Sequence, residues 1–420
     1  MIKKIVAGFC LLFTTVVFSQ ENNASPYSYY GLGDQKFKGT VENRSMGGLS
    51  IVPDSIHINL QNPANYSSLL LTTFTVGAGN SSTDMKTATE KDKINRTSLD
   101  YLAVAIPFNK VGIAVGLMPY TSVGYKIEDG ETDADNVNRY KRFDGSGGLN
   151  RVFAGGSYQI TPNFSLGAEF AYNFGNIETA SIVAIPEVQY ATKETNDSHY
   201  EGASFSFGAA YKAKIKNKYT WSTGVTYTPG STLQGDTSRE ISTITLTASG
   251  AETTIDMLEV ASYKEDVKLP SKFTIGTGFG RERKWFAGAE YTFQESNELG
   301  NRFDDVTNAA FESAYKISVG GYYIPNYTSF TSYFSRITYR AGIKYANTGL
   351  VINDEQIKDY GFSFGLGLPL GGYAGASNVN IGAEIGKRGT TNAGLVQENY
   401  VNIFISLSFN DRWFVKRKYD

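Results

Sequence analysis

The chain of 420 residues contains one cysteine, two histidines and only 11 prolines. The cysteine, Cys10, lies in an N-terminal stretch that we expect to be removed, so the mature chain has no thiol for a disulfide, an iron–sulfur cluster or a cysteine-ligated zinc ion. After the first twenty residues there is no run of about 18 uncharged apolar residues, which excludes a helical membrane protein. The formal net charge of −2 shows no basic excess, and no nucleic-acid partner is expected.

The histidines give little support to catalysis. His57 is flanked by two isoleucines, and we expect a packed or hydrogen-bonded residue there. His199 directly follows Ser198, and adjacent residues of an extended chain point in opposite directions. A catalytic triad needs its nucleophile, base and orienting group to converge. The sequence therefore predicts a protein that is not an enzyme. Zinc-like spacing of His, Asp and Glu is missing, so neither a metal site nor a cofactor is predicted.

What the chain has in abundance is aromatic residues and glycine, with 28 Tyr, 26 Phe and 44 Gly. Aromatic residues favour strands, and glycine serves turns and close backbone contacts. The clearest strand is Tyr400–Phe409, in which polarity alternates with a period of two. One face carries Val401, Ile403, Ile405, Leu407 and Phe409, and the other carries Asn402, Phe404, Ser406 and Ser408. In an outer-membrane barrel the first face contacts lipid and the second faces the lumen, and Tyr400 and Phe409 then mark the closing strand.

The same pattern recurs from residue 69 onward and predicts about fourteen strands. The candidates are 69–79, 99–108, 110–119, 149–160, 164–175, 203–213, 219–228, 267–280, 285–294, 314–324, 335–346, 360–369, 378–388 and 399–409. Short connections alternate with long polar ones near 80–98, 120–148, 176–202, 229–266, 295–313, 347–359 and 389–398. Short periplasmic turns and long extracellular loops are typical of outer-membrane barrels. A soluble sandwich would carry more charge on its outer faces, and a propeller would repeat every 40–50 residues. The predicted fold is all-β, an antiparallel transmembrane β-barrel of about fourteen strands with an N-terminal luminal plug.

Four regions follow from these patterns. Residues 1–19 form a signal peptide, with Lys3 and Lys4 before the apolar stretch and small residues at the −3 and −1 positions. Residues 20–68 have no sustained period, and we expect them to fold into the lumen as a plug or hatch. Residues 69–409 form the barrel. Residues 410–420 form a basic, aromatic tail, which would dock a periplasmic partner or anchor at the membrane interface.

Charged residues fall on the faces that we expect to point into the lumen. They are Glu169, Glu290, Lys316, Arg336, Arg340, Lys344, Glu384 and Arg388. One interpretation is a network that anchors the plug, and the alternative is a charged constriction that selects solutes. A polar interior is expected of such a barrel in either case.

The N-terminal segment carries four short motifs: Tyr30-Gly31-Leu32-Gly33, Met46-Gly47-Gly48, Asn59 and Asn62-Pro63-Ala64. A secreted barrel preceded by such a segment resembles the FadL-type outer-membrane transporters of hydrophobic molecules. The resemblance implies a hatch inside the barrel and ligands that bind near the extracellular loops and leave sideways through the wall. The pattern is also similar to barrel relatives that shuttle or assemble secreted proteins.

Two functions remain open at this stage. The first is passive transport of small hydrophobic molecules such as long-chain fatty acids. The second is a non-transporting accessory barrel in an outer-membrane assembly or secretion complex. Expected partners are outer-membrane lipids, a hydrophobic ligand in the first case, and proteins bound through the loops or the 410–420 tail in the second. The expected location is the outer membrane of a Gram-negative-type bacterium, with both termini periplasmic.

Overall fold

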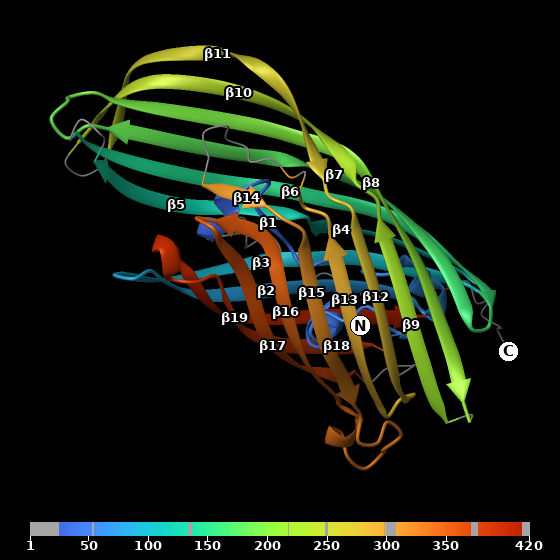
Figure 1. Ribbon diagram of the computed structural model, residues 1–420. Helices are drawn as coiled ribbons and strands as arrows, with labels where there is room; N and C mark the ends of the chain where they lie inside the picture. Colours follow the sequence, from blue (N-terminus) through green and yellow to red (C-terminus); the bar gives the residue numbers. More distant parts are fainter. Residues whose placement is uncertain are drawn as a thin grey trace, which may run out of the picture.

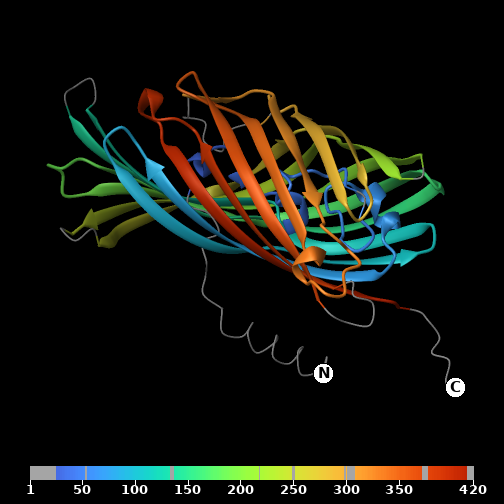
Figure 2. The same cartoon turned by 90° about the horizontal axis from the view of Figure 1, so that it is seen from below.

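The computed structural model describes residues 25–52, 54–132, 137–216, 218–247, 251–297, 299, 308–370 and 377–413. This part of the chain forms a closed, antiparallel barrel of fourteen wall strands. Residues 25–68, which we call the luminal segment, lie inside it (Figures 1 and 2). The predicted fold class is confirmed. No helix in the described ranges is long and apolar enough to cross a bilayer.

Eleven of the wall strands are continuous along the chain. They are β2 (Thr72–Lys86), β3 (Lys91–Phe108), β6 (Asn138–Thr161), β7 (Phe164–Ala184), β8 (Ala191–Ile215), β13 (Trp285–Gln294), β15 (Ala314–Tyr323), β16 (Thr338–Ile352), β17 (Glu355–Pro369), β18 (Asn378–Arg388) and β19 (Gln397–Asp411). The other three are each broken once, giving β4 (Val111–Pro119) with β5 (Thr121–Thr132), β9 (Tyr219–Thr228) with β10 (Ser231–Leu246), and β11 (Glu252–Leu269) with β12 (Lys272–Arg281). Pairing of β19 with β2 closes the barrel.

The remaining elements are short. Inside the barrel are η1 (Pro26–Tyr29), β1 (Asp34–Gln35), α2 (Val41–Arg44) and η2 (Pro63–Ser68). Outside the luminal segment are β14 (Ala309–Phe311), η3 (Phe334–Arg336) and η4 (Asn392–Gly394). As far as the structure describes it, the luminal segment therefore contains only short regular elements.

The two faces of the wall strands differ as the alternation predicts. In β19, Ile403 is 56% exposed on the outer face, whereas the neighbouring Phe404 is 1% exposed on the inner face. Across the closing seam, Phe409 pairs with Phe74 and Tyr400 pairs with Thr83. Phe409 faces outward, and Tyr400 is buried on the lumen side.

Two ends of the barrel can be distinguished. At the short-turn end, tight connections such as Asn109-Lys110 join consecutive strands, and β2 begins there. At the opposite end, which we call the ribbon end, strands continue as β-ribbons well past the wall (Figure 1). The segments 80–98, 120–148, 176–202, 229–266 and 347–359, predicted as loops, are therefore largely strands. The prediction was wrong because ribbon residues such as Lys91 and Lys93 meet water and carry no apolar alternation.

The wall is not continuous at the ribbon end. Strand β3 pairs with β4 from Leu102 to Phe108, but β5 pairs with β6 and with β1 of the luminal segment instead of β3. The break falls at Tyr120, between β4 and β5. As a result, β3 and β5 are not paired with each other beyond Leu117, and we call the gap between these two strands the split. This split and the luminal segment next to it define the region where a function is to be sought.

Candidate functional site: the luminal segment and the barrel wall

The luminal segment runs from the ribbon end to the short-turn end. Near its start, the Tyr27 hydroxyl donates to the carbonyl of Val396 in the connection before β19. At its end, the amide of Ser67 donates to Ser157 Oγ at 2.6 Å, close to the turn between β6 and β7. The described part of the segment therefore begins at the ribbon end and leaves the lumen at the short-turn end, where β2 begins.

Two buried carboxylates of the wall bind the luminal segment. Glu169 on β7 accepts from Lys38 Nζ at 2.6 Å and from the Tyr66 hydroxyl at 2.7 Å. Glu290 on β13 accepts from the backbone amide of Ser50 at 2.8 Å and also from its hydroxyl. Glu169 and Glu290 are 2% and 3% exposed. A buried charge is stabilised only when it is paired and hydrogen-bonded, and the luminal segment supplies these partners.

A third carboxylate, Glu384 on β18, joins the wall to helix α2. It accepts from Arg44 Nε at 2.9 Å and from Lys344 Nζ at 2.6 Å. Lys344 on β16 also reaches Asp359 at 3.0 Å, so the pairing crosses three neighbouring strands. The Arg44 guanidinium carbon lies 4.7 Å from the ring centre of Phe404. Arg44 therefore holds α2 against the wall through both charge and stacking.

The other predicted lumen charges take different places. Arg388 binds Asp34 of β1 at 2.7 Å. Arg340 donates to Asn380 at 3.0 Å, and Asn380 donates in turn to Glu42 of α2 at 2.6 Å. The strand predicted from residue 335 begins only at Thr338, so Arg336 is not a strand residue as predicted. Arg336 lies in η3 before β16, with its guanidinium 5.2 Å from the Tyr333 ring, because the chain turns at the short-turn end before the strand begins.

The Lys316 ammonium lies 5.9 Å from the ring centre of Phe37 and forms no ion pair with a residue that the structure describes. It faces the lumen, as predicted, and contacts the luminal segment through an aromatic ring instead of a carboxylate.

The motifs of the luminal segment shape its backbone. Gly47 and Gly48 follow α2 with φ of +72° and +87°, a conformation that glycine adopts at little cost. The amide of Gly47 donates to Ser363 Oγ on β17 at 2.8 Å, which ties this turn to the wall. The Tyr30–Gly33 motif forms a turn closed by the Gly33 amide and the Tyr30 carbonyl at 3.2 Å.

The Asn59 and Asn62-Pro63-Ala64 motifs start η2. Asn62 Oδ1 accepts from the amide of Ala64 at 3.0 Å, which is an N-cap, and Pro63 occupies the first position of the turn. Asn62 also donates to the carbonyl of Ala209 on β8 at 3.2 Å. Asn59 Oδ1 accepts from the amide of Asn62 at 3.0 Å. The residues of the motif therefore cap η2 and attach it to the wall.

His57 forms a charged cluster between the luminal segment and the wall. Its Nδ1 lies 2.6 Å from Asp54 Oδ2 and its Nε2 lies 3.5 Å from Glu42 Oε1. Burial alone lowers the His57 pKa, but the carboxylates of Asp54 and Glu42 outweigh burial and raise the pKa above its usual value, against an opposing effect of Arg340. The expectation of a hydrogen-bonded histidine is met.

We expect H57Q to remove a pH dependence from the thermal stability of the purified barrel. Because the His57 pKa is raised on folding, its stabilising effect is complete below the unfolded pKa of about 6.5 and is lost as the pH rises through the folded pKa. The melting temperature of the wild type should therefore fall on the alkaline side of this range, and that of H57Q should change less. Equal pH profiles of the two proteins would contradict this role.

Close backbone contact brings the luminal segment onto the wall at several glycines. A Cβ added to Gly112 on β4 would lie 2.2 Å from the carbonyl carbon of Tyr66, and one added to Gly342 on β16 would lie 2.2 Å from that of Met46. Neither distance is compatible with a side chain, so the glycines allow the two backbones to touch. A Cβ added to Gly276 on β12 would lie 2.6 Å from Cγ2 of the Ile51 side chain.

The luminal segment also covers the lower part of the split in the wall. Asp34 and Gln35 of β1 pair with Ser122 and Thr121, on the edge of β5 that faces away from β6. One step higher, the amide of Gly124 donates to Ser28 Oγ at 3.1 Å. The backbone groups on this edge of β5, which does not pair with β3, thus find hydrogen-bond partners in the luminal segment.

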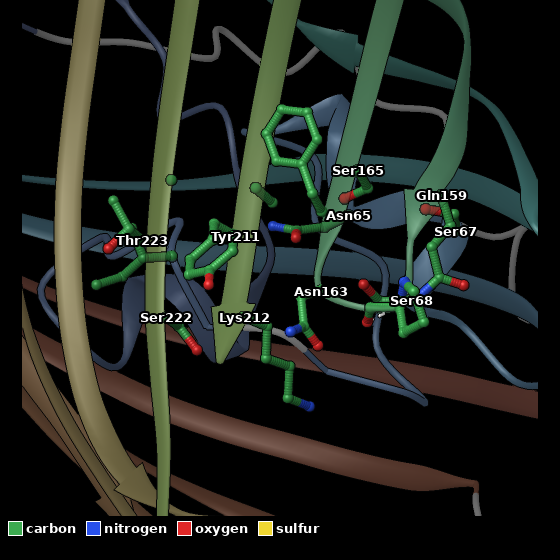
Figure 3. A pocket seen from close by; sticks show the side chains of 15 residues that line it. Asn65, Ser67, Ser68, Gln159, Asn163, Ser165, Tyr211, Lys212, Ser222 and Thr223 are labelled. Carbon is green, nitrogen blue, oxygen red and sulfur yellow. Dashed lines mark hydrogen bonds between the residues drawn. The ribbon is translucent and has the colours of Figure 1, made fainter. Parts of the chain in front are cut away.

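Three cavities lie along the luminal segment. The smallest, of about 60 Å³, lies at the short-turn end between Asn65, Ser67 and the turn around Asn163 (Figure 3). A second, of about 400 Å³, lies within the lumen and has a mixed lining, in which charged groups such as Lys38 and Lys272 lie beside aromatic residues such as Phe37 and Phe311. The first is too small for a typical ligand, and the second is large enough for one.

The third cavity, of about 320 Å³, lies in the ribbons above the split. Its aromatic lining is Tyr29, Tyr125, Phe143, Tyr200 and Tyr263, and it also contains Glu194, Arg239 and Glu265. Next to it, the apolar side chains of Ile182, Ala191 and Ile244 pack together in one cluster of neighbouring ribbons.

A comparison with models of protein families shows to which family this chain belongs. A family model described as BamG matches residues 1–420, the whole of the sequence. The chain belongs to the BamG family. No curated protein sequence matches it.

Solved structures show that this BamG-family chain shares the FadL-type barrel fold, as the resemblance implied. The CymD monoaromatic hydrocarbon channel is 12% identical, with a TM-score of 0.58 over 90% of this chain and 99% of the other. The toluene transporter TbuX of Ralstonia pickettii is 13% identical, with a TM-score of 0.57 over 89% and 99%. A FadL homologue from Pseudomonas aeruginosa is 12% identical, with a TM-score of 0.57 over 90% and 98%. The fold is that of an outer-membrane barrel.

The similar solved barrels are channels and transporters, and in this BamG-family chain Ser198 and His199 do not form a catalytic pair. Ser198 is buried and accepts from Thr237 Oγ1 at 2.9 Å. The exposed His199 lies 2.7 Å from Asn176 Oδ1 instead. In the part of the chain that the structure describes, no group of three His, Cys, Asp or Glu residues could hold a metal ion.

Proposed function

We propose that this BamG-family barrel is a non-transporting accessory subunit of an outer-membrane assembly or secretion complex. The observation that carries the proposal is the attachment of the luminal segment to three separate parts of the wall by the buried carboxylates of Glu169, Glu290 and Glu384. Glu169 and Glu384 form ion pairs with Lys38 and Arg44, and removing one partner of a buried ion pair costs about 3–5 kcal/mol, so a segment held in this way acts as a fixed plug.

The split in the wall supports the same proposal. In a transporter that releases ligands sideways, an opening between strands has to stay accessible from the lumen. Here β1 and Ser28 occupy the edge of β5 at the base of the split. The lumen behind them holds the cavity of about 400 Å³, where a hydrophobic molecule would have to lie against the charged groups of Lys38 and Lys272 as well as against apolar side chains.

Passive transport of a small hydrophobic molecule, such as a long-chain fatty acid, is the second candidate. It is favoured by the FadL-type fold and by the aromatic cavity of about 320 Å³ next to the split. A ligand bound between Tyr125, Phe143 and Tyr200 would reach the outside between β3 and β5 if β1 moved away from β5.

The orientation in the membrane follows the usual arrangement of such barrels. We propose that the short-turn end faces the periplasm and the ribbon end faces the cell exterior. The C-terminal strand then ends in the periplasm, where the 410–420 tail, of which only the part up to Trp413 is described, is available to a partner. Ser25, in contrast, lies at the ribbon end, which argues against a periplasmic position for the start of the luminal segment.

Native mass spectrometry of the protein, extracted gently from its own membranes, separates the two candidates. An accessory subunit should appear with stoichiometric partner chains and without a bound hydrophobic molecule. A barrel without partner chains that carries a fatty acid or similar compound in near-stoichiometric amount would refute the accessory role and support transport.

A further inference from the structure

We infer that the free edge of β11 is a docking site for a β-strand of another protein, which pairs with it through main-chain hydrogen bonds. This inference rests on the proposed accessory function and names the surface and the type of partner that it requires. Strand addition to an exposed sheet edge is a common mode of protein recognition, in which backbone groups supply affinity and alternate side chains supply specificity.

Strand β11 forms the border of the ribbon sheet. Its residues from Glu252 to Leu269 pair with β10 on one side. On the other side the neighbouring wall strand would be β13, but β13 ends at Gln294 after pairing with β12. Among the described residues, the stretch from Glu252 to Tyr263 therefore has no strand on its second edge, and Figure 1 shows it arching along the margin of the molecule.

This stretch exposes apolar side chains on both of its faces. Ile255, Met257, Leu258 and Val260 are 55%, 54%, 63% and 36% exposed. Met257 and Leu258 are adjacent and thus point to opposite sides of the sheet. A strand buried against a single core would expose only one face, so the pattern indicates a strand that lacks neighbours.

Lipid does not explain this exposure. Strands β11 and β12 follow each other along one wall position, and the part within the barrel wall is β12, which starts at Lys272. Tyr263 of β11 lies nine residues before Lys272, which is about 30 Å along the strand. At the start of β11, Glu252 binds Arg142 and also accepts from Lys193 at 2.8 Å. Such an ion-pair cluster belongs outside the hydrocarbon region. The apolar residues of β11 therefore face water, where clustered exposure marks an interaction site.

The charges of β11 define the partner. Asp256 and Glu259 flank the apolar residues, and no lysine or arginine occurs between Glu252 and Tyr263. Neither carboxylate has an ion pair among the described residues. A complementary strand would therefore carry apolar residues together with at least one lysine or arginine that lies opposite these acids.

A second copy of the chain fits less well. If two β11 strands paired antiparallel with Ile255 opposite Val260, Asp256 of one copy would face Glu259 of the other. Like charges that are directly opposite in a sheet destabilise the pair. The edge of β11 thus selects a different protein with a basic, apolar strand.

The test places a photoreactive phenylalanine derivative at Leu258 in the full chain in its native membrane. Irradiation should give one product, with another protein, in which the attached residue lies in an extended segment that has a lysine or arginine within two residues. The same derivative at Phe362, which is equally exposed but lies on the lipid-facing wall, should not give this product.

Charge reversal completes the test. D256K/E259K should lower the yield of the product at least about tenfold, because the new lysines would face the basic partner. The matched control E90K/D92K makes the same charge change on exposed residues at the tip of the β2–β3 ribbon, and it should leave the yield within about twofold of the wild type.

Several results would overturn the inference: a product between two copies of the chain, a product with lipid alone, no product, or an unchanged yield in D256K/E259K. Native mass spectrometry separates these from failure of the accessory function. Partner chains that are present with the wild type, but without a cross-link at Leu258, would refute only the docking edge. A wild type that has no partner chains would refute the accessory function as well.

Discussion

The triple variant E169A/E290A/E384A is expected to conduct ions through a barrel that is closed in the wild type. Each substitution removes a buried acceptor for Lys38, Ser50 or Arg44 and leaves polar groups of the luminal segment without a partner. A loss of about 3–5 kcal/mol for each of the two broken ion pairs, at Glu169 and at Glu384, together with the lost acceptor of Ser50, is enough to displace the segment. A fourteen-strand barrel without its luminal segment would leave a water-filled path, since its width lies between filled eight-strand and open sixteen-strand barrels. Single-channel recording in planar bilayers measures the effect.

The matched control removes three carboxylates that do not contact the luminal segment. E201A/E312A/E355A should remain closed, since Glu201 binds Tyr172 on the barrel surface and Glu312 binds Gln356. Both proteins should keep the gel-mobility shift on boiling that marks a folded barrel. A closed triple variant that retains this shift would show that the buried carboxylates do not hold the segment in place.

The double variant G112A/G342A is expected to expose the luminal segment to protease. Each added methyl group would meet a backbone carbonyl carbon of the segment at 2.2 Å, at Tyr66 and at Met46. Overpacking of this kind costs about 1–3 kcal/mol, and here the obstacle is backbone that cannot rotate away. Trypsin should therefore cut after Arg44 in the variant but not in the wild type, and mass spectrometry of the fragments identifies the site.

A glycine with open space around it provides the control. Gly156 on β6 has only the carbonyl oxygen of Gly112 near an added Cβ, at 3.8 Å. G156A should therefore be as resistant as the wild type. Cleavage in G156A to the same extent as in G112A/G342A would show that any alanine in the wall loosens the protein, and the close contact with the luminal segment would then not be its cause.

The sequence predicts the wall better than it predicts the interior. Alternation places Glu169, Glu290 and Glu384 on the lumen side, because a period of two fixes the face of each strand residue. It does not predict their partners Lys38 and Ser50, because the luminal segment has no period and its contacts depend on where the chain crosses the lumen. For these partners there was only the general expectation that a buried charge is paired.

The ribbons were missed for a related physical reason. The alternation that reveals a strand arises from unlike environments on its two faces, and above the membrane both faces of a ribbon meet water. The stretch 229–266 therefore looked like a loop, although it contains most of β10 and β11. Its one visible signal was the run of Ile255, Met257, Leu258 and Val260, which is unusual for a solvated loop. The split at Tyr120 had no signal in the sequence, because it depends on which strands pair.

The most direct test of the account is a cryo-electron microscopy structure of the protein in the complex that is extracted from native membranes. The account predicts density for the luminal segment with Ser50 at Glu290 and Arg44 at Glu384, β1 paired with β5, and a neighbouring protein bound to the barrel. An empty or displaced luminal segment, with a hydrophobic molecule between the aromatic residues next to the split and no neighbouring protein, would contradict it.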